Sequence, residues 1–387
     1  MVSAVRHGSS MREVGHQFGV TVGTVHYWVR RAGGKPLDEV DWSDRPPVPH
    51  VIQRTDRAME NLVLTIRSEL KETSALGEYG APAIYHDLLG RGTPHPPSIR
   101  TIGRILERRG ALDSRHRVRR RPPPPGWYLP DVAATQSELD SFDVIEDLVI
   151  EGGIHVDVLT GISLHGGLVA SWPDSSIPAT KVVDALIEHW RALGLPAYAQ
   201  FDNDTRFQGA HHFADTIGRV IRLCLSLGVT PVFAPPRETG FQAAIESFNA
   251  RWQAKVWERF HHESLAALQV QSARYVAAYR NHASSRMERA PARRCFPSSW
   301  QLDLQADPCG SMIFLRRTSE QGKVRLLGHT FLVDGNWPHR LVRAEVDLQA
   351  GAISFYALRR KEPTYQPLLR TVGYRFPKRK FIDTSKG

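Results

Sequence analysis

Cysteine and long apolar segments are the scarcest features of this 387-residue sequence. The three cysteines, Cys224, Cys295 and Cys309, are too widely spaced for a CxxC metal site or a disulfide framework. No stretch approaches the ~20 consecutive apolar residues of a membrane span, and the first residues lack the apolar segment of a secretory signal. Histidine pairs occur at 211–212 and 261–262, but without paired cysteines or an HExxH motif they do not favour zinc. We therefore expect a soluble cytoplasmic protein with reduced thiols and no membrane partner.

Basic residues are also scarce in the middle of the chain. Residues 131–180 contain nine acidic side chains and no lysine or arginine. Residues 131–298 carry a net charge of −4, whereas residues 1–130 and 299–387 each carry +7. The length predicts two or three domains. Two basic flanks around an acidic centre indicate a polyanion-binding protein whose centre concentrates carboxylates for another purpose.

Residues 1–40 predict a helix-turn-helix DNA-binding unit. Apolar residues recur at helical spacing on both sides of a turn near Gly19, Thr21 suits the N-cap of the second helix, and Gly33 suits its end. Polar side chains near the start of such a helix reach base edges, and arginines near its end reach phosphates. The alternative is a helical hairpin that serves packing alone. The candidate DNA contacts are Thr21, Thr24, His26, Arg30 and Arg31.

Residues 51–114 repeat this rhythm and predict a second helix-turn-helix-like domain. Ser98 is a natural cap for its last helix, which presents a basic face that includes Arg104 and Arg108. A basic proline-rich linker follows at 115–130. Arginine density before a stiff polyproline spacer favours an arm that tracks phosphates, and the alternative is a solvated linker. Its candidate contacts are Arg117, Arg119, Arg120 and Arg121.

Residues 131–298 predict a central α/β core. Three strand-like segments are followed by helix, strand, helix, strand and helix, which is the order of a ribonuclease H-like fold. Three carboxylates fall where a two-metal site needs them: Asp140 in the first strand, Asp202 at the end of the fourth, and Glu246 on the helix after the fifth. Hard oxygen ligands suit Mg²⁺ or Mn²⁺, and two such ions activate an attacking oxygen and stabilise a departing one.

Three motifs carry a resemblance to a known family. ELDSFDV, AQFDNDTRFQG and AAIESFNARW resemble the three acidic motifs of the DDE transposase and retroviral-integrase superfamily, in its bacterial insertion-sequence branch. The resemblance covers residues 131–298 and implies that Asp140, Asp202 and Glu246 are the catalytic, metal-binding residues. Asn249 and Lys255 would follow on the same helix to contact DNA.

The resemblance implies a transposase that cuts DNA at transposon ends and joins them to target DNA. It further implies a nucleoid-associated bacterial protein that binds two Mg²⁺ or Mn²⁺ ions, terminal inverted repeats and target DNA, and that acts as a homo-oligomer. A decayed or domesticated copy that binds DNA without cutting it is the alternative, and a nuclease of the same fold is a third interpretation.

The motifs also leave individual positions open. Asp204 and Arg206 stand where the family usually has glycine and glutamate. Asp143 and Asp157 compete with Asp140 for the first position, although strand alternation puts Asp143 and Asp140 on opposite faces. Asp202 and Glu246 are separated by 43 residues, more than is usual, and Glu238 lies at the usual interval. The ESFN neighbourhood favours Glu246.

Residues 311–376 predict a fourth, C-terminal domain. Short alternating strands separated by glycine and asparagine turns suggest a small β-barrel. The resemblance implies an SH3-like barrel that binds DNA, with a basic tail to residue 387, and the alternative is a barrel that only stabilises the protein.

Overall fold

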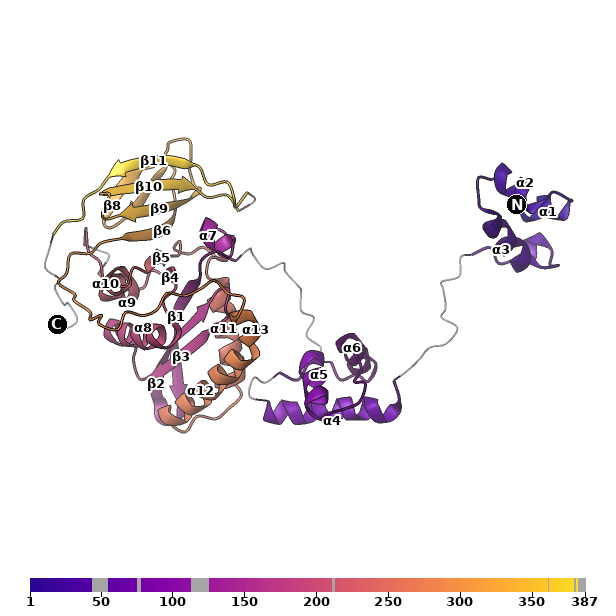
Figure 1. The fold of residues 1–387 in the computed structure, drawn as a ribbon, viewed down its shortest axis with the longest axis horizontal. Helices are drawn as coiled ribbons and strands as arrows, with labels where there is room; N and C mark the ends of the chain where they lie inside the picture. Colours follow the sequence, from indigo (N-terminus) through magenta and orange to yellow (C-terminus); the bar gives the residue numbers. More distant parts are fainter. Residues whose placement is uncertain are drawn as a thin grey trace. The chain divides into compact units, whose positions relative to one another are not determined.

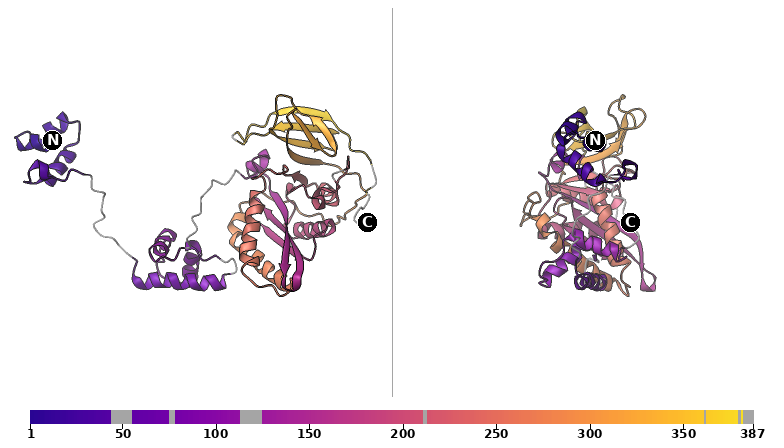
Figure 2. Two further views of the ribbon diagram at one scale, coloured as in Figure 1. Left: turned by 180° about the vertical axis from the view of Figure 1, so that it is seen from behind. Right: turned by 90° about the vertical axis from the view of Figure 1, so that its right-hand side faces the viewer.

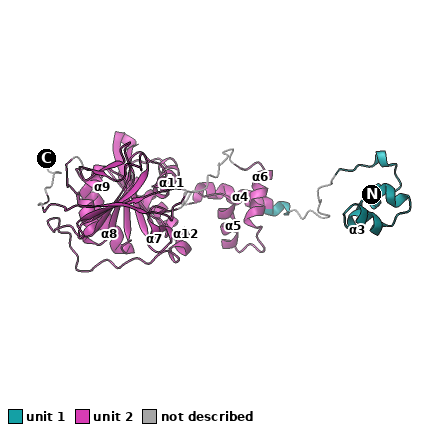
Figure 3. Ribbon diagram, turned by 90° about the horizontal axis from the view of Figure 1, so that it is seen from above, with its two compact units in different colours: residues 1–59 teal, residues 60–387 magenta. Residues whose placement is uncertain are grey.

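The computed structural model describes residues 1–43, 55–74, 78–112, 125–210, 213–360, 362–378 and 381. The linker candidates Arg117, Arg119, Arg120 and Arg121 lie outside these residues. The chain divides into two compact units, residues 1–59 and 60–387 (Figure 3). In the described part of the chain, no helix combines the length and apolar character needed to cross a membrane.

The first unit contains three short helices, α1 (Val2–Arg6), α2 (Met11–Gln17) and α3 (Val22–Ala32), and a 3₁₀ turn, η1 (Leu37–Glu39). The predicted caps of α3 are confirmed: the Thr21 hydroxyl accepts a hydrogen bond from the Thr24 amide, and Gly33 ends the helix. Gly19, with φ +65°, makes the turn between α2 and α3. Val14 and Val25 are fully buried, so these two helices pack together as the apolar spacing predicts.

Three further helices, α4 (Arg57–Thr73), α5 (Ala81–Gly90) and α6 (Ile99–Arg108), correspond to the second predicted helical unit. Ser98 caps α6 by accepting from the Thr101 amide, as its position predicts. Glu60 on α4 forms ion pairs with Arg108 and, at 3.1 Å, with Arg109. Arg108 is therefore engaged within this unit, where it shares the Glu60 carboxylate with Arg109.

The predicted element order of the core is confirmed. Strands β1 to β5 stand in the order β3-β2-β1-β4-β5; β1, β2 and β3 are antiparallel, and β1, β4 and β5 are parallel. This mixed sheet is consistent with a ribonuclease H-like core. Its strands are β1 (Leu139–Ile150), β2 (Ile154–Ser163), β3 (Val169–Asp174), β4 (Tyr198–Phe201) and β5 (Thr230–Phe233), with the short helix α7 (Pro130–Ala133) before β1 and the turn η2 (Glu151–Gly153) after it.

Helices cover both faces of this sheet (Figure 1). On the face covered by α8 and α10, the hydrophobic cluster includes Phe142, Trp190 and Phe201. On the face covered by α11 and α12, it includes Val158, Ile245 and Phe248. Figure 2 shows the same two layers from behind. The helices are α8 (Ala179–Leu193), α9 (Thr205–Gln208), α10 (Arg219–Ser226), α11 (Ala243–Trp252), the π-helical turn η3 (Gln253–Trp257), α12 (Leu265–His282) and α13 (Ser284–Met287).

The C-terminal strands extend the core sheet. The prediction of alternating strands in residues 311–376 is confirmed, but β6 pairs in parallel with β5, and the sheet continues in the order β5-β6-β9-β10-β11. Among the described residues, β7 and β8 form a separate two-stranded sheet, and no strand ladder closes a barrel. The strands are β6 (Ser311–Arg317), β7 (Lys323–Leu326), β8 (His329–Leu332), β9 (Leu341–Asp347), β10 (Ala352–Ala357) and β11 (Leu368–Gly373).

Aromatic packing explains why β6 joins the core. Phe233 on β5 and Phe314 on β6 are buried, paired in register and stacked with ring centroids 5.1 Å apart. The Phe201 ring on β4 continues this row, 6.1 Å from Phe233. The row gives the core and the C-terminal strands one shared hydrophobic interior.

We expect Phe314→Ala to destabilise both parts together. Removing a buried aromatic ring costs ~3–5 kcal/mol, and a shared interior transmits that loss to the whole sheet. Urea unfolding of the full chain, followed by tryptophan fluorescence and far-ultraviolet circular dichroism, should show one transition at lower urea by both probes. Tyr365→Ala, at an exposed aromatic side chain, is the control. Two separate transitions would mean that the C-terminal strands fold as an independent domain.

Candidate active site

The parallel pairing of β1 with β4 places two carboxylates beside each other. The observed register pairs Asp140 with Ala199 and Ser141 with Gln200. Continued by two residues, the same register sets Asp143 opposite Asp202, which directly follows β4. Side chains at paired positions lie on the same face of a sheet. Asp143, and not Asp140, is therefore the β1 carboxylate that lies next to Asp202.

The charges around Asp143 confirm this proximity. Burial, followed by the negative charges of Asp202 and Glu246, raises the pKa of Asp143 to about 6. The Asn249 amide on α11 donates a 2.8 Å hydrogen bond to Asp143 Oδ2, and the Thr160 hydroxyl donates to Asn249 Oδ1 at 2.7 Å. Asn249, predicted to contact DNA, thus holds the Asp143 carboxylate.

Asp202 lies in a loop that contains both acidic and basic side chains. Burial and the neighbouring Asp204 carboxylate raise the pKa of Asp202, while the Asp204 backbone N–H, which donates to Asp202 Oδ1 at 2.9 Å, and Arg206 act against the rise. Asp204 caps α9 by accepting from the Arg206 amide, and the two side chains form an ion pair at 2.8 Å. Arg206 also pairs with Glu146 at 2.6 Å. The two unusual residues of this motif largely neutralise each other.

Glu246 occupies the first turn of α11, where its side chain is exposed. Its charge contributes to the raised pKa of Asp143, and Asn249, three residues later on α11, binds Asp143, so Glu246 lies near Asp143. Glu238 lies elsewhere, in an ion pair with Arg317 and 3.7 Å from Arg360. Of the two candidates for the third position, Glu246 is the one that lies near Asp143.

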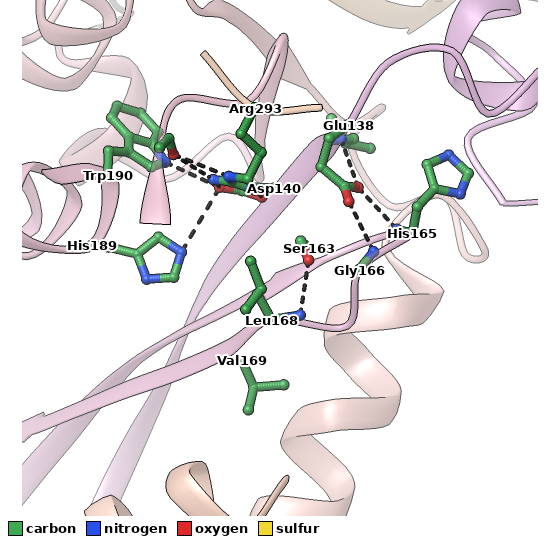
Figure 4. Close-up of polar contacts among 12 residues, drawn as sticks. Glu138, Asp140, Ser163, His165, Gly166, Leu168, Val169, His189, Trp190 and Arg293 are labelled. Atoms are coloured by element: carbon green, nitrogen blue, oxygen red, sulfur yellow. Dashed lines mark hydrogen bonds and ion pairs between the residues drawn. The ribbon is translucent and has the colours of Figure 1, made fainter. Parts of the chain in front are cut away.

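The placement expected for Asp140 needs correction. Its side chain is fully buried on the α8 side of the sheet, where it accepts hydrogen bonds from the Arg293 guanidinium at 2.8 and 2.6 Å and from the Trp190 indole at 3.0 Å (Figure 4). Burial alone would raise the pKa of Asp140, but the Arg293 charge and hydrogen bonds outweigh it and hold the pKa low. A fully buried carboxylate paired with Arg293 in this way presents no exposed oxygen to a metal ion.

A second buried carboxylate, Glu138, lies two residues before Asp140 in the sequence. Its oxygens accept backbone N–H hydrogen bonds from Leu139, His165 and Gly166 at 2.8–3.1 Å (Figure 4). Burial and the charge of Asp140 nevertheless raise its pKa. Its partners fix the turn between β2 and β3, so we assign it a structural role. The other competitor, Asp157, lies on β2 three residues before Thr160, the partner of Asp143, and alternation directs it to the opposite face.

The remaining DNA-contact candidates differ in exposure. Thr21, His26, Arg30 and Arg104 have exposed side chains, and Thr24 is half-buried. Arg31 is mostly buried, pairs with Asp41 at 3.2 Å and covers the Trp28 ring, which gives it a packing role. Lys255 lies in η3, over the Tyr79 ring.

The donor set fits a divalent cation in its chemistry. Asp143, Asp202 and Glu246 are hard oxygen donors from three separate elements, and burial together with repulsion from Asp202 and Glu246 raises the pKa of Asp143. A cation would relieve that repulsion. The described residues contain no group of three or more histidine, cysteine, aspartate or glutamate side chains already gathered at metal-binding distance.

Comparison with solved structures finds integrases. The chain is similar to the HTLV-2 integrase catalytic core domain in complex with magnesium (13% identity, 29% of this chain and 64% of that chain, TM-score 0.23) and to the catalytic core domain of BIV integrase (17%, 35% and 80%, 0.25). It is also similar to a simian T-cell lymphotropic virus intasome in complex with PP2A regulatory subunit B56 gamma (13%, 82% and 99%, 0.33). Neither a family model nor a curated protein matches the sequence. At these scores the likeness adds nothing to what the strand order itself shows.

We expect Asp143→Asn to stabilise the metal-free protein at neutral pH. A carboxyl whose folded pKa lies above its unfolded value contributes stability that is complete below the unfolded value, near pH 4, and lost as the pH rises through about 6. The gain from the substitution should therefore grow between these two pH values, to about 1–3 kcal/mol. Urea midpoints in EDTA at several pH values measure it, with Asp157→Asn as the matched control. A gain that does not change with pH would contradict the assigned environment.

We expect Arg293→Met to be strongly destabilising. The substitution leaves Asp140 buried without its counter-charge, which typically costs ~3–5 kcal/mol. Arg289→Met, at an exposed arginine in the same segment, should change the free energy of unfolding little. Equal effects of the two substitutions in urea unfolding would show that the Asp140–Arg293 pair is dispensable.

Proposed function

We propose that this protein is a DDE-type polynucleotidyl transferase, a transposase that cuts DNA at transposon ends and joins the freed 3′-hydroxyl to target DNA. The observation that carries the proposal is the placement of Asp143 beside Asp202 by the pairing of β1 with β4, with Glu246 on α11 near Asp143. A strongly perturbed pKa caused by burial and like charges is typical of functional sites. Asp143 replaces Asp140 in the proposed catalytic set.

The three carboxylates would hold Mg²⁺ or Mn²⁺. Two such ions, when bound, supply activation of the attacking oxygen and stabilisation of the departing one. The chain's own residues orient the ligands: Asn249 and Thr160 fix the Asp143 carboxylate, and the Asp204 amide fixes Asp202. Ligands held by surrounding hydrogen bonds lose less entropy when a metal binds.

The joining reaction exchanges one phosphodiester for another. The 3′-oxygen of the transposon end forms a bond to a target phosphorus while that phosphorus loses its bond to a neighbouring 3′-oxygen. The proton of the attacking hydroxyl is matched by the proton taken up by the departing oxygen, so the reaction needs no redox partner and no covalent enzyme intermediate.

Both flanks would bind DNA. In the helical units, Thr21, His26, Arg30 and Arg104 remain exposed and could reach the duplex. We propose that the domains predicted at 1–40 and 51–114 bind the terminal repeats, that the arginines of the linker at 115–130 track phosphates, and that a homo-oligomer brings two ends together.

We expect Asp143→Asn and Asp202→Asn to abolish metal-dependent cleavage and joining, and to leave DNA binding intact. Each removes one ligand charge, which should reduce the rate by orders of magnitude, since charge stabilisation supplies most of the catalysis. The assay uses nicking of supercoiled plasmid and joining of labelled duplexes in Mg²⁺ or Mn²⁺. Asp157→Asn is the matched control and should retain activity.

Other outcomes would change the assignment. A dead Asp140→Asn variant that is folded and as stable as the wild type, beside an active Asp143→Asn variant, would return the first position to Asp140. A wild-type protein that binds duplex DNA but neither cuts nor joins it with any divalent metal would favour the decayed DNA-binding protein.

A further inference from the structure

A basic pocket lies between the loop at residues 235–242 and the C-terminal strands. Its volume is ≈ 400 Å³, and its wall contains four arginines and a single carboxylate. The loop connects β5 to α11, which carries Glu246 eight residues after Glu238. The residues that matter here are Glu238, Arg317, Trp337, Arg340, Arg359 and Arg360.

The arginines are held in place before any ligand binds. The guanidinium groups of Arg340 and Arg359 lie 4.7 and 5.3 Å from the centre of the Trp337 ring, which is itself buried. Arg360 covers the Phe241 ring at 5.2 Å and donates a 2.8 Å hydrogen bond to the Thr239 carbonyl. Stacked guanidinium groups lose little further freedom when they bind an anion.

Glu238 is the one negative group among them. It pairs with Arg317, whose guanidinium also donates to the His339 carbonyl, and it lies 3.7 Å from Arg360. Arg359 also pairs with Glu362 at 3.0 Å. Two carboxylates cannot balance four arginines, so the pocket keeps an excess of positive charge. Its volume is also far larger than a carboxylate group requires.

We propose that this pocket binds a phosphate of a DNA strand, and that Glu238 occupies part of the same site as an internal substitute when DNA is absent. Arginine forks match phosphate oxygens as well as they match carboxylate oxygens. DNA binding would then release Glu238 from Arg317 and Arg360. Because Glu238 belongs to the loop that leads into α11, a bound strand would be anchored on the segment that also positions Glu246.

A strand of DNA fits this pocket better than a free small anion. The pocket lies in the C-terminal part of the chain, whose residues 299–387 carry a net charge of +7, so a polyanion meets favourable potential beyond the pocket itself. The inference rests on the proposed function only in taking DNA as the ligand. It is tested by binding without metal, whereas the proposed function is tested by metal-dependent cleavage.

The experiment measures binding of a fluorescein-labelled duplex to the full chain in EDTA over a range of KCl concentrations. Arg360→Gln should weaken binding roughly 5- to 10-fold and reduce the slope of log K against log salt by about 1. Glu238→Gln should act in the opposite direction and tighten binding about 3-fold or more, since it removes the competing carboxylate. Asp307→Asn, which breaks the exposed Lys378–Asp307 pair, is the matched control for loss of one negative charge and should change affinity little.

The opposite signs distinguish a phosphate site from a structural ion pair. If Glu238 only stabilises the loop, Glu238→Gln will lower the melting temperature and leave binding unchanged or weaker, which would overturn the proposal. Inorganic phosphate added at constant ionic strength should compete for the same arginines and weaken DNA binding by the wild type more than binding by Arg360→Gln. Phosphate that raises the melting temperature but leaves DNA affinity unchanged would assign the pocket to a free anion instead. If the wild type cleaves plasmid with Mn²⁺ and Glu238→Gln leaves the DNA affinity unchanged, the pocket is refuted and the proposed function stands.

Discussion

The pairing of β1 with β4 is the constraint on which the chemistry of this chain depends. Side chains alternate along β1, so its register decides which carboxylates face α8 and which face α11. In the observed register Asp140 enters the interior, where only an ion pair can accommodate it, and Asp143 emerges opposite Asp202. A shift by one residue would exchange these environments, leaving Asp143 buried without a cation and Asp140 without its arginine. Satisfying Asp140 and assembling the acidic site therefore require the same register.

The buried carboxylates of the core differ in the partners that surround them. Asp140 receives a guanidinium and an indole, and Glu138 receives three backbone N–H groups. At Asp143, by contrast, the charges of Asp202 and Glu246 add to the cost of burial and raise the pKa to about 6. Only Asp140 is fully compensated, by its ion pair; Glu138 keeps a raised pKa despite its three donors, and Asp143 lies among acids that add to the rise. Leaving its charge partly unbalanced is the arrangement expected where a cation completes the site.

The sequence predicted those features that depend on local signals. Thr21 and Ser98 cap helices where their spacing places them, and Asp202 and Glu246 fall on the predicted elements. The first acidic position was ambiguous in the sequence because Leu139-Asp140 and Phe142-Asp143 both fit the motif. Alternation separates these two aspartates but does not say which face is closed, since that depends on Arg293, 153 residues away. The small β-barrel expected at 311–376 is not confirmed for a similar reason: alternation identifies strands, whereas the joining of β6 to β5 depends on the distant pair Phe233 and Phe314.

Glu238 shows how environment separates acids that the sequence cannot rank. Its interval from Asp202 made it a candidate for the third ligand, yet its carboxylate lies between Arg317 and Arg360, which hold its pKa low, chiefly through the Arg317 hydrogen bond. A carboxylate whose charge is already balanced by guanidinium groups is stabilised little by a metal ion. A carboxylate whose pKa is raised by neighbouring acids is stabilised much more. Asp140 and Asp143 differ in the same way: Arg293 holds the pKa of Asp140 low, whereas burial and neighbouring acids raise that of Asp143. We propose that in this chain the sign of the surrounding charge, more than spacing along the sequence, separates the candidate metal ligands from the carboxylates held in ion pairs.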